Sequence, residues 1–455
     1  MLKIKDKLID ITDALYARLF GRRMSERMRS FAVNMSWSFY SALIAMPLAM
    51  LVATVAGRLM GPEQFGYYNL VILVSSYLVI LAFWGLDVST VKEIAKTQDR
   101  RDRSSIFFSS AVFVVFALVL ITLAYFIFGT QIASIIGVPL GVLSFALFYT
   151  YAASFKAIYD SLMRGLEDFR TQAIGRIVEA IVTALVFALL AFVLKKLNYE
   201  YYLVAVFSGA LVIVIYYLSK ARGYCAYFSY KKLKQMLSES KFFMLSALLA
   251  TVFVSADRLL IAKFVDIKTL GIYSAYYLAS LTVVITFARI ISNVLLPATA
   301  KARDKKFVER MNLVALKSSP LVYIFIIVFM TAFLLIFGKE YPLKLSYLLL
   351  FALGATLYFY QSIYATVMLD AGKSRYAKYV YLSNVVNIVT VAGYYFVLRF
   401  LPVPIELVLV VFVINTSVKI AIQQLFLRAI NEGGDQGSKK NLSLAELMYN
   451  LARRI

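Results

Sequence analysis

The sequence predicts an all-α polytopic membrane protein, in which twelve transmembrane helices form two six-helix bundles, related by internal duplication, around a central cavity. Hydrophobic residues make up 62% of the 455 residues and charged residues only 16%, whereas ordinary soluble domains have about 45–50% and about 25%. Uncharged stretches long enough to cross a bilayer recur along the chain, and turn motifs of its first half return in its second half. This composition excludes an ordinary soluble enzyme, because a soluble core could not bury so much apolar surface.

The predicted spans follow one another closely along the chain. A helix needs about 20 predominantly apolar residues to cross the bilayer core. The stretch 104–155 contains no Asp, Glu, Lys or Arg, and it holds two helices because Gly129, Gly137, Pro139 and Gly141 interrupt it. In chain order, the twelve predicted spans are 31–57, 65–86, 105–129, 138–162, 171–195, 200–219, 242–264, 270–297, 311–337, 344–369, 376–398 and 405–427.

The basic residues indicate which way the spans are oriented. The chain has 48 Lys and Arg against 25 Asp and Glu, a net charge of +23. Thirty-four of the basic residues fall in the two ends and alternate loops on one side of the twelve-span arrangement, and eight fall on the other side. Because Lys- and Arg-rich loops stay cytoplasmic, both termini are predicted to be cytoplasmic in a multi-pass protein of the cell membrane. The positive charge therefore fits membrane orientation, and no nucleic-acid partner is expected.

Three basic segments outside the spans have the apolar spacing of amphipathic helices. They lie in an N-terminal arm (1–30), a linker (220–241) and a C-terminal tail (429–455), which flank the predicted bundles 31–219 and 242–428. In the linker, Tyr230, Leu233, Met236 and Leu237 share one face beside three lysines. Such helices can lie in the interface and bind anionic lipid; the alternative is that all three segments are solvated basic stretches.

An internal duplication relates the two predicted bundles. Gly66 and Tyr68, in the turn after the first span, match Gly271 and Tyr273 after the seventh, and the matched glycines are 205 residues apart. Gly165 and Phe169 match Gly372 and Tyr376 with a spacing of 207 between the glycines. Because each half has six spans, both halves have the same orientation in the membrane. This arrangement is typical of transporters that work by alternating access around a cavity. The alternative is that the duplication records only the origin of the fold.

Several motifs resemble one family. The run Gly61-Pro62-Glu63-Gln64-Phe65-Gly66-Tyr67-Tyr68 after the first span, Gly85-Leu86 followed by Lys92-Glu93-Ile94-Ala95, and Asp257-Arg258-Leu259-Leu260-Ile261-Ala262-Lys263-Phe264 followed by Gly271-Ile272-Tyr273 are similar to the polysaccharide biosynthesis export family. This family of lipid-linked oligosaccharide flippases belongs to the multidrug/oligosaccharidyl-lipid/polysaccharide (MOP) exporter superfamily. The resemblance implies a MATE-like pair of bundles around a central cavity. It also implies transfer of a polyprenyl-phosphate- or pyrophosphate-linked oligosaccharide from the cytoplasmic to the outer leaflet, for surface polysaccharide or glycoconjugate synthesis.

Candidate site residues are the polar groups inside the spans, because an intramembrane charge costs at least about 2.5–3.5 kcal/mol at a helix centre. The predicted cavity cations for phosphate are Arg289, Arg258, Arg176, Lys156 and Lys419. The three lysines in spans, Lys317 included, lie near helix ends and can instead extend their amines to the interface. The predicted cavity polar residues are Asn34, Ser38, Ser41, Asn384, Asn387 and Asn415, with hydrogen bonds between helices as the alternative. Glu179 and Asp257 are candidates for ion coupling, although membrane potential acting on bound charge would also serve.

Several function classes are excluded or disfavoured by residue content. The chain has no His and a single Cys, Cys225, so His-containing metal sites and His-dependent catalytic triads are excluded. We therefore expect no catalytic residue, no metal, no cofactor and no enzyme activity, and we expect membrane lipids, lipid-linked oligosaccharide and glycan-assembly membrane proteins as partners. The alternatives that stay open are a MATE-like multidrug or ion antiporter, a membrane glycosyltransferase or polymerase acting on the same lipid, and a non-transporting scaffold.

Overall fold

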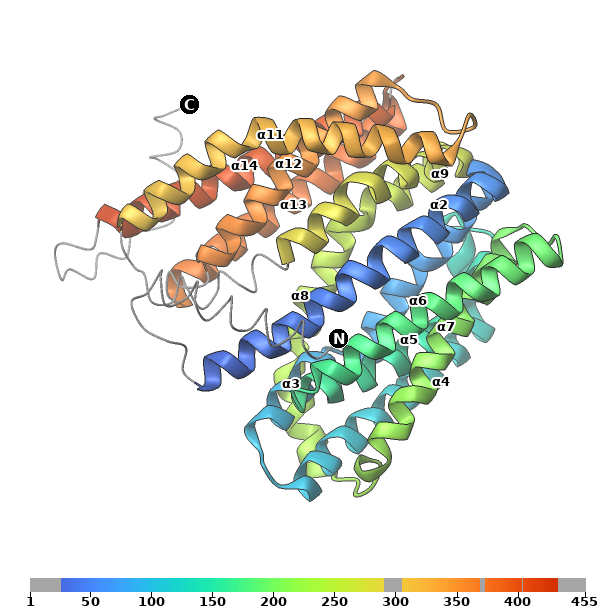
Figure 1. Cartoon of the computed structure of the whole chain (residues 1–455), viewed down its shortest axis with the longest axis vertical. Helices are drawn as coiled ribbons and strands as arrows, with labels where there is room; N and C mark the ends of the chain where they lie inside the picture. Colours follow the sequence, from blue (N-terminus) through green and yellow to red (C-terminus); the bar gives the residue numbers. More distant parts are fainter. Residues whose placement is uncertain (1–25, 290–304, 369–372, 403, 433–455) are drawn as a thin grey trace. The chain divides into compact units, whose positions relative to one another are not determined.

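The protein is described by a computed structural model that covers residues 26–289, 305–368, 373–402 and 404–432. Within these ranges the chain forms helices and short connections, and it contains no β-strand (Figure 1). The predicted amphipathic tail 429–455 and the arm 1–30 lie almost wholly outside the described residues. The all-helical fold class predicted from composition is confirmed.

Helix α2 (Glu26–Phe83) contains the first two predicted spans. The helix is interrupted at Gly61, whose φ of 79° lies in the left-handed region that favours glycine. Pro62 follows directly and lacks the backbone N–H that a continuous helix would use. The Gly-Pro pair therefore produces the break that the turn motif predicted.

Six further helices follow, and several of them begin or end at capping residues. They are α3 (Leu86–Lys96), α4 (Arg100–Ile136), α5 (Leu140–Gly165), α6 (Phe169–Ala188), α7 (Tyr199–Ala221) and α8 (Tyr230–Phe264), and α6 continues into the π-helical turn η1 (Leu189–Val193). The Asp99 carboxylate caps α4, Asp168 caps α6 and Asn198 caps α7 by accepting backbone N–H groups. Gly137, with φ 79°, ends α4 inside the long uncharged stretch. The two-helix interpretation of that stretch is thus confirmed.

The chain divides into two compact units, the first comprising 1–255 with 266–271 and the second 256–265 with 272–455. In the first unit, α3 packs between α4 and α5, and its Ile94 contacts the α-carbon of Gly165 so closely that a Cβ there would lie 2.8 Å from the Ile94 Cβ. Buried side chains from α3, α4, α5 and α7 form one apolar core, which includes Leu86, Phe107, Leu162 and Tyr217.

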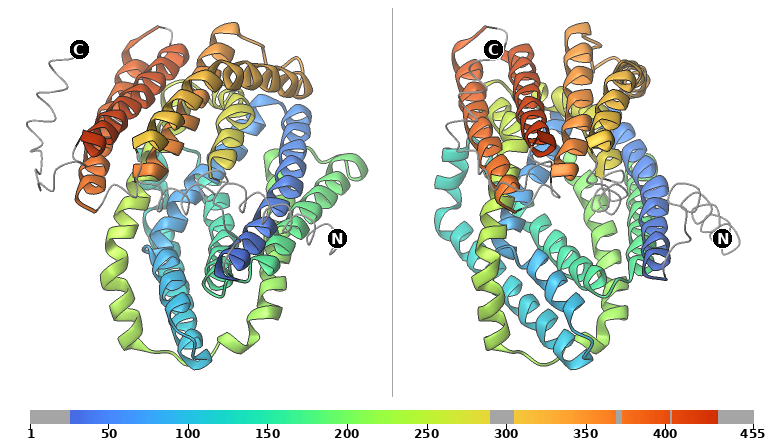
Figure 2. Two further views of the ribbon diagram at one scale, coloured as in Figure 1. Left: turned by 60° about the vertical axis from the view of Figure 1, so that its left-hand side comes forward. Right: turned by 90° about the vertical axis from the view of Figure 1, so that its left-hand side faces the viewer.

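The second unit is built from helices that lie side by side. α9 (Ile267–Tyr277) enters it and continues into the π-helical turn η3 (Leu278–Thr282), followed by α11 (Lys305–Phe337), α12 (Leu345–Met368), α13 (Lys373–Phe400) and α14 (Pro404–Glu432). α12 and α13 both pack against α14, and α11 packs against α12 (Figures 1 and 2). Tyr276 stacks on Phe351 with ring centroids 5.5 Å apart, which joins the start of this unit to α12.

Ten segments of the described residues are long and apolar enough to cross a membrane. The first, Ser36–Phe83, contains both spans predicted on either side of Gly61. The predicted span 242–264, which lies in α8, is not among the ten. The number of twelve spans and the predicted domain boundaries therefore stay predictions.

The apolar residues of the predicted linker helix pack against protein, whereas the sequence predicted that they lie on the membrane surface. α8 begins at Tyr230 and runs without a break into the predicted seventh span. Leu233 and Met236 are buried in the core of the first unit, with 8% and 2% of their surface exposed. These apolar residues of the segment thus pack on protein. Helical periodicity predicts that the apolar face is covered, but it does not distinguish a cover of lipid from a cover of protein.

Candidate functional site

A group of charged side chains lies between α5 and α6 within the first unit. Lys156 of α5 donates a hydrogen bond to Glu179 of α6, with 2.6 Å between Nζ and Oε1. The side chains are 29% and 18% exposed. Among the described residues Glu179 therefore forms its ion pair with a lysine of the neighbouring helix, and not with Arg176 one turn away on its own helix.

A second carboxylate, Asp160, lies one turn beyond Lys156 and binds side chains of two other helices. Its Oδ1 accepts hydrogen bonds from Gln172 of α6 (3.1 Å) and from the Tyr217 hydroxyl of α7 (2.8 Å). Gly175 lets α7 approach this closely, since a Cβ there would lie 2.9 Å from the Tyr217 ring. Asp160, Gln172 and Tyr217 are not among the residues predicted from the sequence, although Asp160 lies four positions after Lys156 and so shares its helix face.

Arg176 lies on the same face of α6 as Gln172 and Glu179, at positions i, i+4 and i+7. The side chain is half-buried, and its charge acts electrostatically on the Tyr217 hydroxyl. Within the part of the chain that the structure describes, its guanidinium forms no ion pair, because both nearby carboxylates bind other partners. Arg176 is thus a half-buried cation that has no acidic partner among the described residues.

The second unit contains the adjacent pair Asp257 and Arg258. The Asp257 carboxylate is buried and accepts hydrogen bonds from the Tyr273 hydroxyl (2.6 Å) and from the backbone N–H of Arg258 (2.7 Å). The Arg258 guanidinium lies 4.2 Å from the centre of the Tyr277 ring, a cation–π contact, and its Nε is 3.9 Å from Asp257 Oδ1. The Asp257 carboxylate is thus held mainly by Tyr273 and the backbone, while the Arg258 guanidinium packs on Tyr277.

The remaining predicted cations lie apart from acidic groups. Arg289, at the end of the span that begins with α9, is exposed, and its charge acts on the hydroxyl of Tyr358 in α12. Lys419 on α14 is half-buried and forms no hydrogen bond or ion pair with any described residue. The structure thus places Lys156 in an ion pair, and it gives Arg176, Arg289 and Lys419 no carboxylate partner among the residues it describes.

Some of the predicted polar residues form hydrogen bonds between helices, and others form them within their own helix. Asn415 of α14 donates hydrogen bonds to Asn387 (3.5 Å) and Thr390 of α13, so these amides join helices. The buried Ser41 hydroxyl donates to the Ser38 carbonyl one turn back, within its own helix. Asn384 is half-buried, and the side chain of Asn34 lies outside the described residues. Hydrogen bonding between helices, the alternative left open from sequence, therefore applies to Asn387 and Asn415.

Further polar links in the second unit were not expected from the sequence. Gln423 donates to the Tyr379 hydroxyl (2.6 Å) and the Gln361 carbonyl (3.1 Å). Asn312 and Gln424 exchange two amide hydrogen bonds, of 3.2 and 3.0 Å. These contacts connect α14 to α11, α12 and α13, and amide residues at helical spacing within spans were the available signal.

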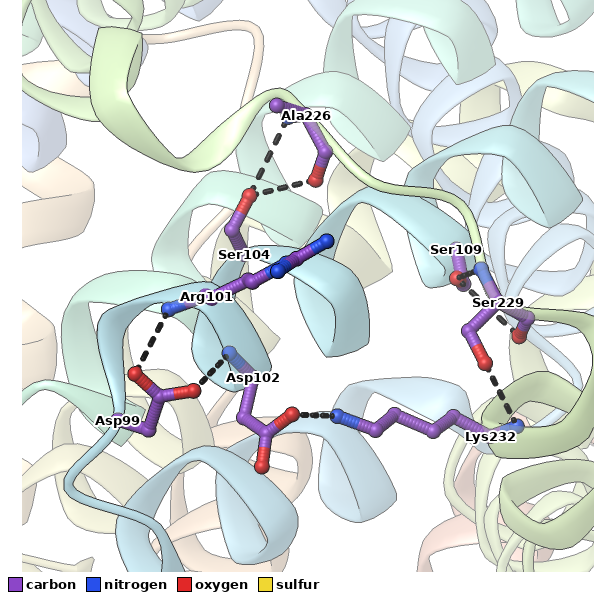
Figure 3. A network of polar contacts seen from close by, with 8 residues as sticks. All are labelled: Asp99, Arg101, Asp102, Ser104, Ser109, Ala226, Ser229 and Lys232. Atoms are coloured by element: carbon purple, nitrogen blue, oxygen red, sulfur yellow. Dashed lines mark hydrogen bonds and ion pairs between the residues drawn. The ribbon is translucent and has the colours of Figure 1, made fainter.

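A polar network holds the segment before α8 against the start of α4 (Figure 3). The Ser104 hydroxyl accepts the Ala226 N–H (3.2 Å) and donates to the Ala226 carbonyl (2.6 Å). The Ser109 hydroxyl does the same with Ser229, at 2.9 and 3.4 Å. Lys232 forms an ion pair with Asp102. Nearby, the hydrogen bond from Lys96 to the Glu93 carboxylate raises the pKa of Lys96.

The ten described segments that are long and apolar enough to cross a membrane indicate an all-α, multi-pass membrane protein. The chain belongs to the family described as polysaccharide biosynthesis protein, whose model matches residues 31–303. A multidrug resistance MATE family transporter of the MOP superfamily is similar in its inward-facing conformation, with 12% identity and a TM-score of 0.65 over 87% of this chain and 99% of that one. An outward-facing conformation of a multidrug resistance MATE family transporter of the MOP superfamily is also similar, with 14% identity and a TM-score of 0.60 over 90% of this chain and 100% of that one. At these identities the likeness shows the fold alone, and a search of curated proteins found no match.

Proposed function

We propose that this protein is a flippase, which moves a polyprenyl-phosphate- or pyrophosphate-linked oligosaccharide from the cytoplasmic to the outer leaflet of the cell membrane by alternating access. Membership of the polysaccharide biosynthesis family and the MATE-like transporter fold support a flippase or transporter. The choice of a lipid-linked, anionic substrate rests on the charges within the spans.

The observation that carries the proposal is the surplus of cations in the described spans. Arg176, Arg289 and Lys419 have no acidic partner there, while the intramembrane carboxylates Asp160, Glu179 and Asp257 all accept hydrogen bonds from protein side chains. A site for a cationic drug would instead leave carboxylates available. Arginine can bind phosphate with two parallel hydrogen bonds, so this surplus fits a phosphorylated headgroup.

The two parts of the substrate, its lipid tail and its polar headgroup, face different barriers in the membrane. The polyprenyl tail can remain in the hydrocarbon, whereas the phosphate and sugar must cross a core of about 30 Å. In this proposal the arginines replace the water that solvates the phosphate, and amide and hydroxyl groups of the spans bind the sugar. Glu179 and Asp257 are the proposed coupling residues, since loss of either negative charge on protonation would weaken its contact with Lys156 or Arg258.

The proposal also fixes an orientation and partners. The excess of basic residues in the ends and alternate loops supports cytoplasmic termini. A substrate assembled on one leaflet and consumed on the other implies glycan-assembly membrane proteins as neighbours. Gene disruption should therefore remove a surface glycan, and an unchanged set of surface glycans would contradict the function.

The direct test is transport in proteoliposomes. A lipid-linked oligosaccharide carrying a fluorophore on its sugar is placed in both leaflets, and an impermeant reductant then destroys the fluorophores that reach the outside. We expect the purified protein to expose the inner pool, and Arg176→Ala and Arg289→Ala to slow this exposure. Wild-type vesicles that behave like empty vesicles would refute the proposal. Gradient-driven uptake of a cationic dye instead would assign the protein to the antiporters.

A further inference from the structure

An apolar groove of about 260 Å³ lies within the second unit, between η3 with the helical residues 283–289 that follow it, α11 and α12. Every residue that lines it is hydrophobic except Ser280, and the Ser280 hydroxyl donates to the Tyr276 carbonyl (2.6 Å) and is not available to a ligand. The groove is smaller than the roughly 300–1,000 Å³ pockets that enclose drug-sized ligands. It therefore suits one hydrocarbon chain segment better than a whole polar ligand.

A row of aromatic rings extends the groove along α11. Phe325 and Phe329 line the groove, and their ring centroids are 6.2 Å apart. Phe333 stacks on Phe329 at 5.5 Å, and Phe337 follows at 6.3 Å. The exposed fraction of these residues falls from 61% at Phe325 to 1% at Phe337. An apolar chain that enters beside Phe325 thus meets a continuous aromatic strip that leads into the protein.

Two cations lie beyond the same end of the groove. Arg289 follows the lining residue Phe287 by two positions, and Lys317 precedes the lining residue Val322 by five, which is about 3 and 7.5 Å along the helix axes. The helices are antiparallel, because Tyr276 at the other end bonds to the Pro342 carbonyl just after α11. Both cations are exposed, and neither forms an ion pair with a described residue.

We propose that this groove binds the isoprenoid tail of a lipid phosphate, with Arg289 and Lys317 binding the phosphate. The inference rests on the proposed function and adds a tail-binding subsite to it. Free polyprenyl phosphate, a monoester, carries about −1.5 to −2 charges at pH 7, and a pyrophosphate linkage to sugar carries one charge on each of its two phosphates. Both match two cations better than the single charge of a phospholipid diester. The volume of about 260 Å³ likewise suits a segment of one polyprenyl tail.

Tryptophan quenching tests the subsite directly. In a chain whose two native tryptophans, Trp37 and Trp84, are replaced by Phe, Phe325→Trp places a fluorophore in the groove. Ile324→Trp is the matched control, since Ile324 lies at the same depth of α11, is 57% exposed and is not part of the groove lining. Vesicles contain brominated polyprenyl phosphate, brominated polyprenol or brominated phosphatidylglycerol as the quencher.

We expect polyprenyl phosphate to quench Phe325→Trp fluorescence at mole fractions at least tenfold lower than it quenches Ile324→Trp. Arg289→Ala with Lys317→Ala should remove that preference, and polyprenol without phosphate should show little of it. Equal quenching of the two positions, or equal preference for phosphatidylglycerol, would overturn the proposal. This equilibrium binding is measured separately from transport, so intact transport without groove preference would refute the subsite alone, and groove preference without transport would refute the flippase alone.

Discussion

Gly66 of α2 and Gly271 of α9 meet at one close helix crossing, and these two glycines are one of the pairs that the internal repeat matches. A Cβ on Gly271 would lie 1.8 Å from the Pro62 carbonyl oxygen and 3.0 Å from the Gly66 nitrogen. A Cβ on Gly66 would lie 2.1 Å from the Ile267 carbonyl oxygen. Backbone therefore contacts backbone here, and no side chain can move aside to make room.

Gly66→Ala and Gly271→Ala should each destabilise the protein, because the helices must separate to accommodate a methyl group. Overpacking of this kind typically costs about 1–3 kcal/mol, measurable as a lower melting temperature in detergent. Gly141→Ala is the control, since a Cβ at Gly141 would have no neighbour within 4 Å. Its melting temperature should stay the same or rise, and equal melting of all three variants would contradict the close crossing.

The ion pair between Lys156 and Glu179 allows a test of charge compensation within the spans. Removing one partner of a buried pair costs up to about 3–5 kcal/mol, whereas replacing both with apolar residues is often neutral. We therefore expect Lys156→Met and Glu179→Leu to lower the melting temperature singly and the double variant to recover most of the loss. Lys196→Met, outside the spans, is the control. Additive losses in the double variant would show that the pair is not coupled.

These examples show how far the sequence could predict the structure. Gly61 and Gly137 act through the local backbone, so their neighbours in sequence were sufficient to place the breaks. The pairing of Lys156 with Glu179 depends on the register between two helices, and no local pattern encodes that register. The apolar stripe containing Leu233 and Met236 likewise predicted a helix but not what packs against it. Apolar lipid and an apolar protein core favour the same side chains at such positions.

Transport should depend more on Arg176 than on a neighbouring arginine of the same helix. Arg176 is half-buried without an acidic partner in the described chain, whereas the exposed Arg170 lies over the Trp37 ring. Hydrogen bonds to charged groups contribute about 1.5–3 kcal/mol, which corresponds to a roughly 10- to 100-fold slower initial rate for Arg176→Ala. Arg170→Ala should transport at nearly the wild-type rate in the same vesicle assay. Equal rates for both variants would remove Arg176 from the phosphate path.

The serine contacts of Figure 3 should decide how firmly the start of α8 is held. Ser109 and Ser104 are almost fully buried, and each satisfies both backbone groups of one residue, Ser229 or Ala226. A hydrogen bond of this kind contributes about 0.5–1.5 kcal/mol net, so Ser104→Ala with Ser109→Ala should release the segment without unfolding the spans. Hydrogen exchange of residues 224–236 should become several-fold faster, while exchange within α12 stays unchanged. Ser208→Ala is the control, because the Ser208 hydroxyl bonds only to the Val204 carbonyl of its own helix. If exchange in 224–236 is equally slow in both variants, the apolar contacts of Leu233 and Met236 alone hold this segment.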